Sequence, residues 1–131
     1  MRLSENDVVL DASALLAVLR AERGAERVEP HLEGARIGAV NLSEVVAQLI
    51  EDGVPEAEIR RAIGRLELDV RAFDQEDAYI AGILCRSTSA LELSFGDRAC
   101  LALAQSVNAP ALTADRSWAQ LDLGIAVEVI R

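Results

Sequence analysis

The chain has 131 residues, of which 51% are hydrophobic and only four are aromatic (one Trp, one Tyr and two Phe), and its formal net charge is −9. This composition predicts a single folded, soluble domain over residues 1–131 with an aliphatic core, and it excludes a disordered chain. The acidic balance also argues against a broad basic face for non-specific nucleic-acid binding.

The predicted elements of the first half alternate between strands and helices. In chain order they are a strand at 7–11, a helix at 12–22 closed by Gly24, a helix at 25–33 interrupted by Pro30, and a strand at 36–40. An amphipathic helix is predicted at 42–52, and Pro55 suits the first turn of a helix that continues to about Leu66.

The second half continues the alternation. It comprises a strand at 68–72, a helix at about 75–87, a helix at 97–107, a strand at 110–114, a short helix at 116–121 and a strand at 125–130. The helix at 97–107 is apolar almost all round and should be central and buried. Strands alternating with helices predict an α/β fold whose mostly parallel sheet is covered on both faces and binds ligands at the carboxyl ends of its strands.

The N-terminal segment MRLSENDVVLDASALLAVL is predicted to be neither a signal peptide nor a membrane span, because Glu5, Asp7 and Asp11 interrupt its apolar residues. Cys85 and Cys100 are expected to be buried free thiols, as in a reducing compartment, so a cytoplasmic location is expected. Three aromatic residues are expected in the core: Phe73, Tyr79 and Trp118.

Two absences restrict the chemistry that this chain can perform. All thirteen basic residues are arginine, so Schiff-base chemistry, a P-loop lysine and a lysine base are excluded. His31 is the only histidine, which excludes a catalytic histidine pair and would leave a zinc site to draw mainly on cysteines and carboxylates. Any chemistry must therefore use carboxylates, hydroxyls and arginines.

Four acidic residues fall at predicted helix N-termini, three of them next to the carboxyl end of a strand: Asp11, Glu44, Asp97 and Asp115. Each alone is more often a helix cap, and Asn41 with Glu44 matches an N-x-x-E capping box. Their neighbours, however, are small or apolar and leave them unpaired. Because each close carboxylate pair repels by about 1 to 4 kcal/mol, a shared location would require a cation, and oxygen-only ligands favour Mg²⁺ or Mn²⁺.

The segments VLDASALLAVL, NLSEVVAQL, LSFGDRACLALA and LTADRSW, in this order, resemble the PIN-domain ribonucleases, and most closely the VapC-type toxins of bacterial toxin–antitoxin pairs. The resemblance covers essentially the whole chain. It implies a PIN-like fold with five parallel strands flanked by helices, an Mg²⁺- or Mn²⁺-dependent endoribonuclease activity, a cognate antitoxin that blocks the site, and a homodimer. Pro30 departs from the pattern and leaves the shape of the second helix, near which antitoxins pack, open.

By this resemblance the four acids are the metal-binding and catalytic residues, and Ser13 and Thr113 match hydroxyl positions beside them. Arg98 and Arg116 follow acids and could reach substrate phosphates, although ordinary surface arginines are an equal alternative. Metal ions would acidify a water that attacks phosphorus, with one acid, Asp97 or Asp115, orienting the water instead of binding metal. Without a histidine pair, the expected products carry 5′-phosphate and 3′-hydroxyl ends.

The sequence has three alternative interpretations besides a PIN-domain ribonuclease. A response-regulator receiver needs a partner lysine, which the chain lacks. A haloacid-dehalogenase-type phosphatase needs a lysine and a second aspartate two residues after the first, where this chain has Ser13. The alternative from a different class is a non-catalytic PIN-like interaction module, against which the presence of all four acids argues.

Overall fold

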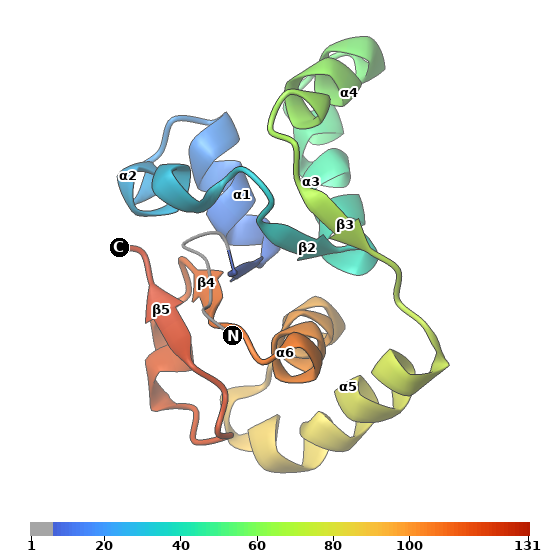
Figure 1. Cartoon of the computed structure of the whole chain (residues 1–131), viewed down its shortest axis with the longest axis vertical. Coiled ribbons are helices and arrows are strands. Elements are labelled where there is room, and N and C mark those ends of the chain that lie inside the picture. Colours follow the sequence, from blue (N-terminus) through green and yellow to red (C-terminus); the bar gives the residue numbers. More distant parts are fainter. Residues whose placement is uncertain (1–6) are drawn as a thin grey trace.

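The structure is a computed structural model that describes residues 7–131. The prediction that the N-terminal segment is no signal peptide concerns residues 1–6 as well, and these lie outside the described residues. Five strands form one sheet in the order β3-β2-β1-β4-β5, and all four neighbouring pairs are parallel (Figure 1). The strands are β1 (Val9–Leu10), β2 (Arg36–Gly38), β3 (Asp69–Arg71), β4 (Ala111–Thr113) and β5 (Val127–Val129). The predicted parallel five-stranded α/β fold is confirmed.

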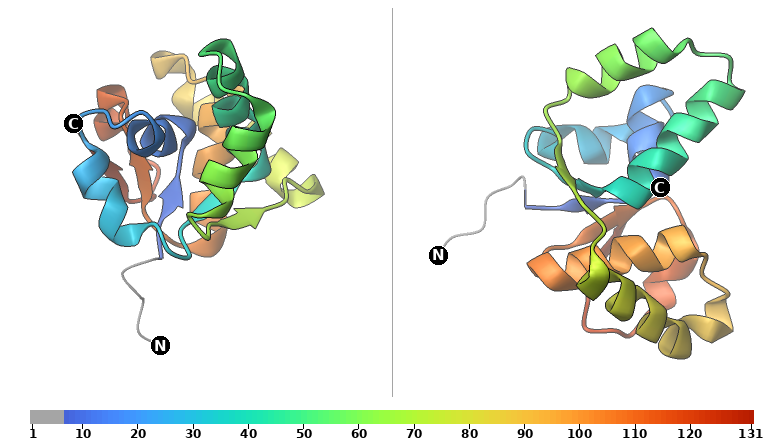
Figure 2. Two further views of the ribbon diagram at one scale, coloured as in Figure 1. Left: turned by 90° about the horizontal axis from the view of Figure 1, so that it is seen from above. Right: turned by 90° about the vertical axis from the view of Figure 1, so that its right-hand side faces the viewer.

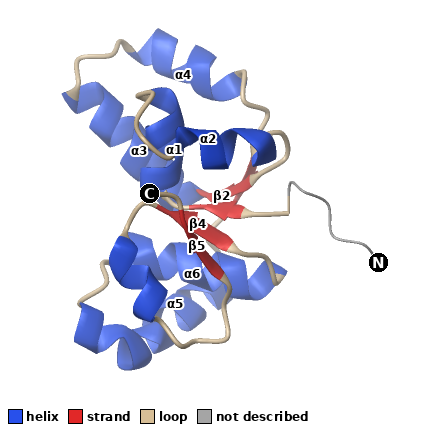
Figure 3. Ribbon diagram, turned by 90° about the vertical axis from the view of Figure 1, so that its left-hand side faces the viewer, coloured by secondary structure: helices blue, strands red, loops and turns tan. Residues whose placement is uncertain are grey.

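Helices cover both faces of the sheet. The α-helices are α1 (Ala12–Leu19), α2 (Ala25–Val28), α3 (Ala39–Glu51), α4 (Glu56–Gly64), α5 (Gln75–Thr88) and α6 (Phe95–Val107). Figure 3 shows α1 to α4 on one face and α5 and α6 on the other, and Figure 2 shows α3 and α4 as a hairpin that projects from the body of the molecule. Three short 3₁₀ helices complete the chain: η1 (Glu29–His31), η2 (Ser89–Leu91) and η3 (Arg116–Gln120).

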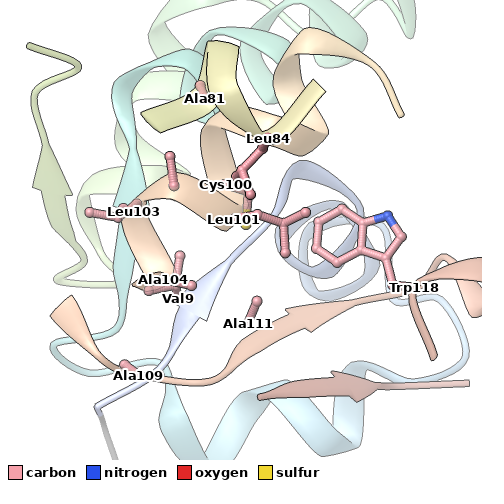
Figure 4. Packing of buried hydrophobic residues seen from close by; sticks show 11 residues of the cluster. Val9, Ala81, Leu84, Cys100, Leu101, Leu103, Ala104, Ala109, Ala111 and Trp118 are labelled. Atoms are coloured by element: carbon pink, nitrogen blue, oxygen red, sulfur yellow. The ribbon is translucent and has the colours of Figure 1, made fainter. Parts of the chain in front are cut away.

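The core between the sheet and α6 is built from small and aliphatic side chains around one large aromatic ring. Trp118 is fully buried there and packs in one cluster with Leu101 and Cys100 (Figure 4). Seven of the thirteen residues of α6 are buried. The prediction that this helix is central, and that Trp118 and Cys100 lie in the core, is confirmed.

Several local predictions are wrong. The first helix ends at Leu19, and Gly24 does not close it but precedes α2, with a φ of +100°. A Cβ at Gly24 would lie 2.9 Å from the carbonyl oxygen of Ile130, so both the backbone conformation and the packing require glycine there. Pro30 falls in a 3₁₀ turn, which shortens the predicted second helix to four residues.

The surface also differs from expectation at two positions. Tyr79 is 60% exposed and Cys85 is exposed, because neither belongs to the buried residues of α5, which are Ala81, Leu84 and Thr88. Phe73 is partly buried and meets Phe95 edge to face, with 5.5 Å between ring centroids. Within residues 7–131, no helix has the length and apolar character needed to cross a membrane.

Candidate active site

The four predicted acids line one pocket at the carboxyl edge of the sheet. The pocket has a volume of about 270 Å³, and its lining residues are Asp11, Ala12, Ser13, Leu16, Asn41, Glu44, Gln48, Asp97 and Asp115. They follow the ends of β1 and β4 or lie in helices α1, α3 and α6, because parallel strands end at the same edge of the sheet and lead there into the next helix. The shared location inferred from the sequence is thus present in the fold.

Asp11 is the buried floor of this pocket and accepts hydrogen bonds on both carboxylate oxygens. Its Oδ1 accepts from the hydroxyl of Ser13 at 2.7 Å and from the backbone N–H of Ala14 at 2.8 Å, as the N-cap of α1. Its Oδ2 accepts from the hydroxyl of Thr113. The same two hydroxyls accept from the backbone N–H groups of Ala114 and Asp115 and so join β1 to the end of β4.

Burial raises the pKa of Asp11 from 3.8 to about 6. The hydrogen bonds from Thr113, Ser13 and Ala14 oppose this shift, and the negative charge of Asp97 adds to it. Burial likewise raises the pKa of the Cys100 thiol well above its ordinary value, and the charges of Asp11, Asp97 and Glu44 reinforce that shift. Negative charge therefore concentrates at this edge of the sheet, as a cation site requires.

Glu44 reaches the pocket from the first half of α3, where it lies against the start of α6. Its Oε1 accepts a hydrogen bond of 2.9 Å from the side-chain amide of Asn41. The predicted capping box of Asn41 and Glu44 is wrong, because α3 begins earlier, after Gly38, and Asn41 is buried inside its first turn. The amide of Asn41 also donates to the carbonyl of Gly96 at 3.0 Å.

Asp97 and Asp115 use one carboxylate oxygen each to cap a helix. Asp97 Oδ2 accepts from the backbone N–H of Ser94, which is the N-cap of α6 and accepts in turn from the N–H of Asp97. Asp115 Oδ1 accepts from the N–H and the hydroxyl of Ser117 in η3. The cap and pocket roles weighed from the sequence are therefore both present in the same side chains.

Neither predicted phosphate-binding arginine lines the pocket. Arg98 donates from Nη1 to the carbonyl of Ala81 at 2.9 Å, so its guanidinium packs against α5. Arg116 is exposed and donates from Nε to the carbonyl of Arg131 at 3.0 Å. The structure thus ties the Arg98 side chain to the fold, while Arg116 lies at the surface directly after Asp115.

The chemistry of the pocket fits a hard divalent cation. From residues 7–131, no hydrogen bond reaches Oδ1 of Asp97, Oδ2 of Asp115 or Oε2 of Glu44. In the same part of the chain, no three His, Cys, Asp or Glu side chains already stand together as a preformed metal site. Mg²⁺ fits such an arrangement because it retains several waters and needs only one or two carboxylates in direct contact.

Two residues of the site escaped the sequence reasoning. The sequence pattern assigns Asn41 only to a capping box, and it gives Gly96 no role beyond its place in the segment LSFGDRACLALA. Their contact with each other and with Glu44 joins positions 55 residues apart, so no local pattern contained it. The short spacing of Asn41 and Glu44 was the one available signal, and it indicated a different role.

Comparisons with known proteins identify the family and the fold of the chain. The family model of the PIN domain matches residues 8–123. A toxin–antitoxin complex from Klebsiella pneumoniae is 19% identical, with a TM-score of 0.77, and the match covers 95% of this chain and 98% of the other.

DNA-bound VapBC from Salmonella typhimurium is 17% identical with the same coverage and a TM-score of 0.75. VapBC-1 from nontypeable Haemophilus influenzae is 18% identical, with a TM-score of 0.69 and coverage of 93% and 96%. At these identities the likeness shows a shared fold. No curated protein matches the chain in sequence.

Proposed function

The chain belongs to the PIN domain family, and we propose that it is a metal-dependent endoribonuclease, the toxin of a type II toxin–antitoxin pair. One observation carries the proposal: four acids from separate parts of the chain line one pocket at the carboxyl edge of a parallel sheet. Three of them keep a carboxylate oxygen without a hydrogen bond from residues 7–131. Capping alone does not require that the caps share a pocket.

In the proposed site Asp11, Glu44, Asp97 and Asp115 hold Mg²⁺ or Mn²⁺. When bound, such an ion acidifies a water and neutralises charge on the scissile phosphate. Asp11 is the member whose position is fixed most firmly, because hydroxyls and a backbone N–H hold both of its oxygens. Ser13 and Thr113 are positioning residues that orient this carboxylate.

Hydrolysis adds water across the phosphodiester bond: a bond forms between the water oxygen and phosphorus, and the bond to the 3′ oxygen breaks. Asp97 and Asp115 line the pocket, and each has one carboxylate oxygen without a hydrogen bond from residues 7–131, so either can orient the water. The chain has a single histidine, so a histidine pair for attack by the 2′-hydroxyl is excluded. We expect products with 5′-phosphate and 3′-hydroxyl ends. Arg116, exposed next to Asp115, is the remaining arginine candidate for substrate phosphate.

The proposal is tested by incubating the purified chain with single-stranded RNA and Mg²⁺ or Mn²⁺, followed by EDTA. Cleavage should require the ion, stop on chelation and fall by about 10³-fold in Asp97→Asn, because loss of one charged ligand removes several kcal/mol of stabilisation. Asp122→Asn, an exposed acid outside the pocket, is the matched control. Cleavage that survives EDTA, or an Asp97→Asn variant as active as wild type, would overturn the metal-dependent mechanism.

We propose that the partner of the chain is an antitoxin protein, because one similar structure is a toxin–antitoxin complex from Klebsiella pneumoniae and another is a member of the VapBC family of toxin–antitoxin systems from Mycobacterium tuberculosis. A short reading frame directly upstream of the gene is its expected source. Co-expression of that product should abolish cleavage, whereas undiminished cleavage would contradict the toxin assignment and leave the nuclease assignment standing. A homodimer remains a prediction, which sedimentation equilibrium of the purified chain measures.

The second candidate is a non-catalytic interaction module. Two observations favour it: Asp97 and Asp115 each have an oxygen engaged in capping, and residues 7–131 contain no preformed group of three metal ligands. The RNA and EDTA experiment separates the two: a module would cleave no RNA with either ion. It would also bind its partner with unchanged affinity after Asp97→Asn.

A further inference from the structure

One wall of the acid pocket is formed by a buried asparagine between two helices. The side chain of Asn41 lies in the first turn of α3 and is only 2% exposed. Its Nδ2 donates to Glu44 Oε1 at 2.9 Å and to the carbonyl of Gly96 at 3.0 Å. A single amide thus connects an acid of α3 to the backbone of α6.

The carboxylate of Glu44 lies directly against the backbone of Gly96. A Cβ at position 96 would meet the whole carboxylate: Glu44 Oε2 would lie nearest, with Oε1 at 2.5 Å and Cδ at 2.6 Å, separations that real Cβ atoms do not show. Gly96 has no positive φ, so the requirement for glycine comes from this close approach and not from the backbone conformation. The carboxylate of Glu44 fits there because Gly96 has no side chain.

The orientation of the Asn41 amide follows from its two acceptors. A carboxylate oxygen and a carbonyl oxygen both require N–H groups, so the nitrogen must face them and the amide oxygen must face away. That Oδ1 is buried, near Gly38, and has no hydrogen-bond partner among residues 7–131. A buried acceptor without a partner is costly, so stability of the fold alone does not account for an asparagine at this position.

We propose that Asn41 is a positioning residue that holds the carboxylate of Glu44 over Gly96, so that Glu44 presents Oε2 to the pocket for a divalent cation. The inference rests on the proposed function for the identity of the ligand. It adds a role for two residues, Asn41 and Gly96, that touch neither substrate nor metal. In this arrangement one N–H of Asn41 donates to Oε1 and the other donates to the Gly96 carbonyl, and Oε2 has no hydrogen bond from the described residues.

The test compares Asn41→Leu with Thr88→Val in the full chain. Leucine has a similar size but lacks both donors, and Thr88 is an equally buried polar residue that donates to the Leu84 carbonyl of α5, outside the pocket. Calorimetric titration with Mn²⁺ should show a dissociation constant raised by about 10- to 100-fold in Asn41→Leu and unchanged in Thr88→Val. In a metal-free crystal structure of Asn41→Leu, the Glu44 carboxylate should leave Gly96.

A second variant keeps the proposal testable if Asn41→Leu does not fold. Gly96→Ala adds a methyl group where the carboxylate lies, while alanine suits the first turn of α6. It should weaken Mn²⁺ binding to a similar degree. Wild-type Mn²⁺ affinity in either folded variant, or an unmoved Glu44 carboxylate in Asn41→Leu, would overturn the positioning role.

The two proposals fail separately in these experiments. If Asp97→Asn abolishes cleavage but Asn41→Leu binds Mn²⁺ as wild type does, the nuclease assignment stands and the role of Asn41 is overturned. If the wild-type chain binds no Mn²⁺, the metal-dependent function is overturned. The crystal structure of Asn41→Leu then still decides whether the amide positions Glu44.

Discussion

The two sides of helix α3 have opposite surroundings. One side carries polar residues into the acid pocket, and the other carries apolar residues into an open groove of about 580 Å³ between α3 and α4. The polar set is Asn41, Glu44 and Gln48, and the apolar set is Leu42, Val46 and Ile50, with Ile59 and Ile63 facing them from α4.

The difference lies in what fixes each set. The amide of Asn41 donates to the Gly96 carbonyl of α6 and to Glu44, so that side of the helix has one defined arrangement. The groove has no such contacts, and no element among residues 7–131 covers Ile50, which is 51% exposed. Substitutions on the pocket side should therefore change the chemistry of the site, and those on the groove side should change only packing.

The largest expected effect is on the pocket side. Glu44→Gln should reduce RNA cleavage by about 10³-fold, equivalent to about 4 kcal/mol, because it removes a charged ligand while the amide oxygen can still accept from Asn41. Its free energy of unfolding should change by no more than about 0.5 kcal/mol, since the side chain is exposed. Cleavage assays and urea denaturation measure the two quantities.

Glu51→Gln is the matched control for this substitution, because Glu51 is exposed at the end of the same helix and lines neither the pocket nor the groove. It should cleave RNA at the wild-type rate. Equal activity of Glu44→Gln and Glu51→Gln would contradict the conclusion that the pocket side of α3 carries the chemistry.

The groove side should respond in stability instead. Ile59→Ala should lower the free energy of unfolding by about 2 to 5 kcal/mol, because Ile59 is only 2% exposed and joins α4 to the core beneath α3. Ile50→Ala should cost at most about 0.5 kcal/mol, since half of its side chain already faces solvent. Both variants should retain wild-type RNA cleavage at temperatures where they are folded.

The alternation of elements, the parallel sheet and the buried α6 all follow from patterns within short windows of sequence, and these predictions are confirmed. Asp11, Glu44, Asp97 and Asp115 could be placed at one edge because strand ends and helix starts are visible locally. Predictions that depend on distant partners fared differently. Asn41 contacts Gly96 across 55 positions, and Arg98 turns to the carbonyl of Ala81 in α5, neither of which local spacing contains.

The stability of the chain should depend on pH, because burial raises the pKa of Asp11 in the pocket from 3.8 to about 6. The folded chain then binds this proton more tightly than the unfolded chain. Asp11 therefore contributes stability at low pH, and that contribution is lost as the pH rises from about 4 to about 6. A rise in pKa of this size corresponds to a contribution of at most about 3 kcal/mol to the free energy of unfolding.

Asp11→Asn isolates this contribution. In EDTA, the difference in free energy of unfolding between Asp11→Asn and wild type should grow in favour of the variant as the pH rises from 4 to 7, although the variant should not cleave RNA. Urea denaturation across this range gives the difference directly. A constant difference at all pH values would show that the buried carboxyl group does not have a raised pKa in the folded chain.

Two ion pairs should contribute least to stability: one joins α1 to the end of α3, and the other lies in α4, where both of its residues line the groove. Arg20 joins α1 to the end of α3 on the pocket side, donating from Nε to Asp52 Oδ2 at 2.9 Å and from Nη2 to Oδ1 at 3.1 Å. Arg60 pairs with Glu56 at 2.9 Å within α4 alone, where both side chains are more than 70% exposed.

Arg20→Gln should lower the free energy of unfolding by about 1 kcal/mol and Arg60→Gln by about 0.3 kcal/mol, because only the first pair is bidentate and connects two elements. Both costs should shrink in 0.5 M NaCl, where exposed charges are screened. Urea denaturation measures both losses in free energy of unfolding. Equal losses would mean that the ion pair within α4 stabilises the fold as much as the pair that joins α1 to α3. That result would contradict the conclusion that only the pocket side of α3 is held by specific polar contacts.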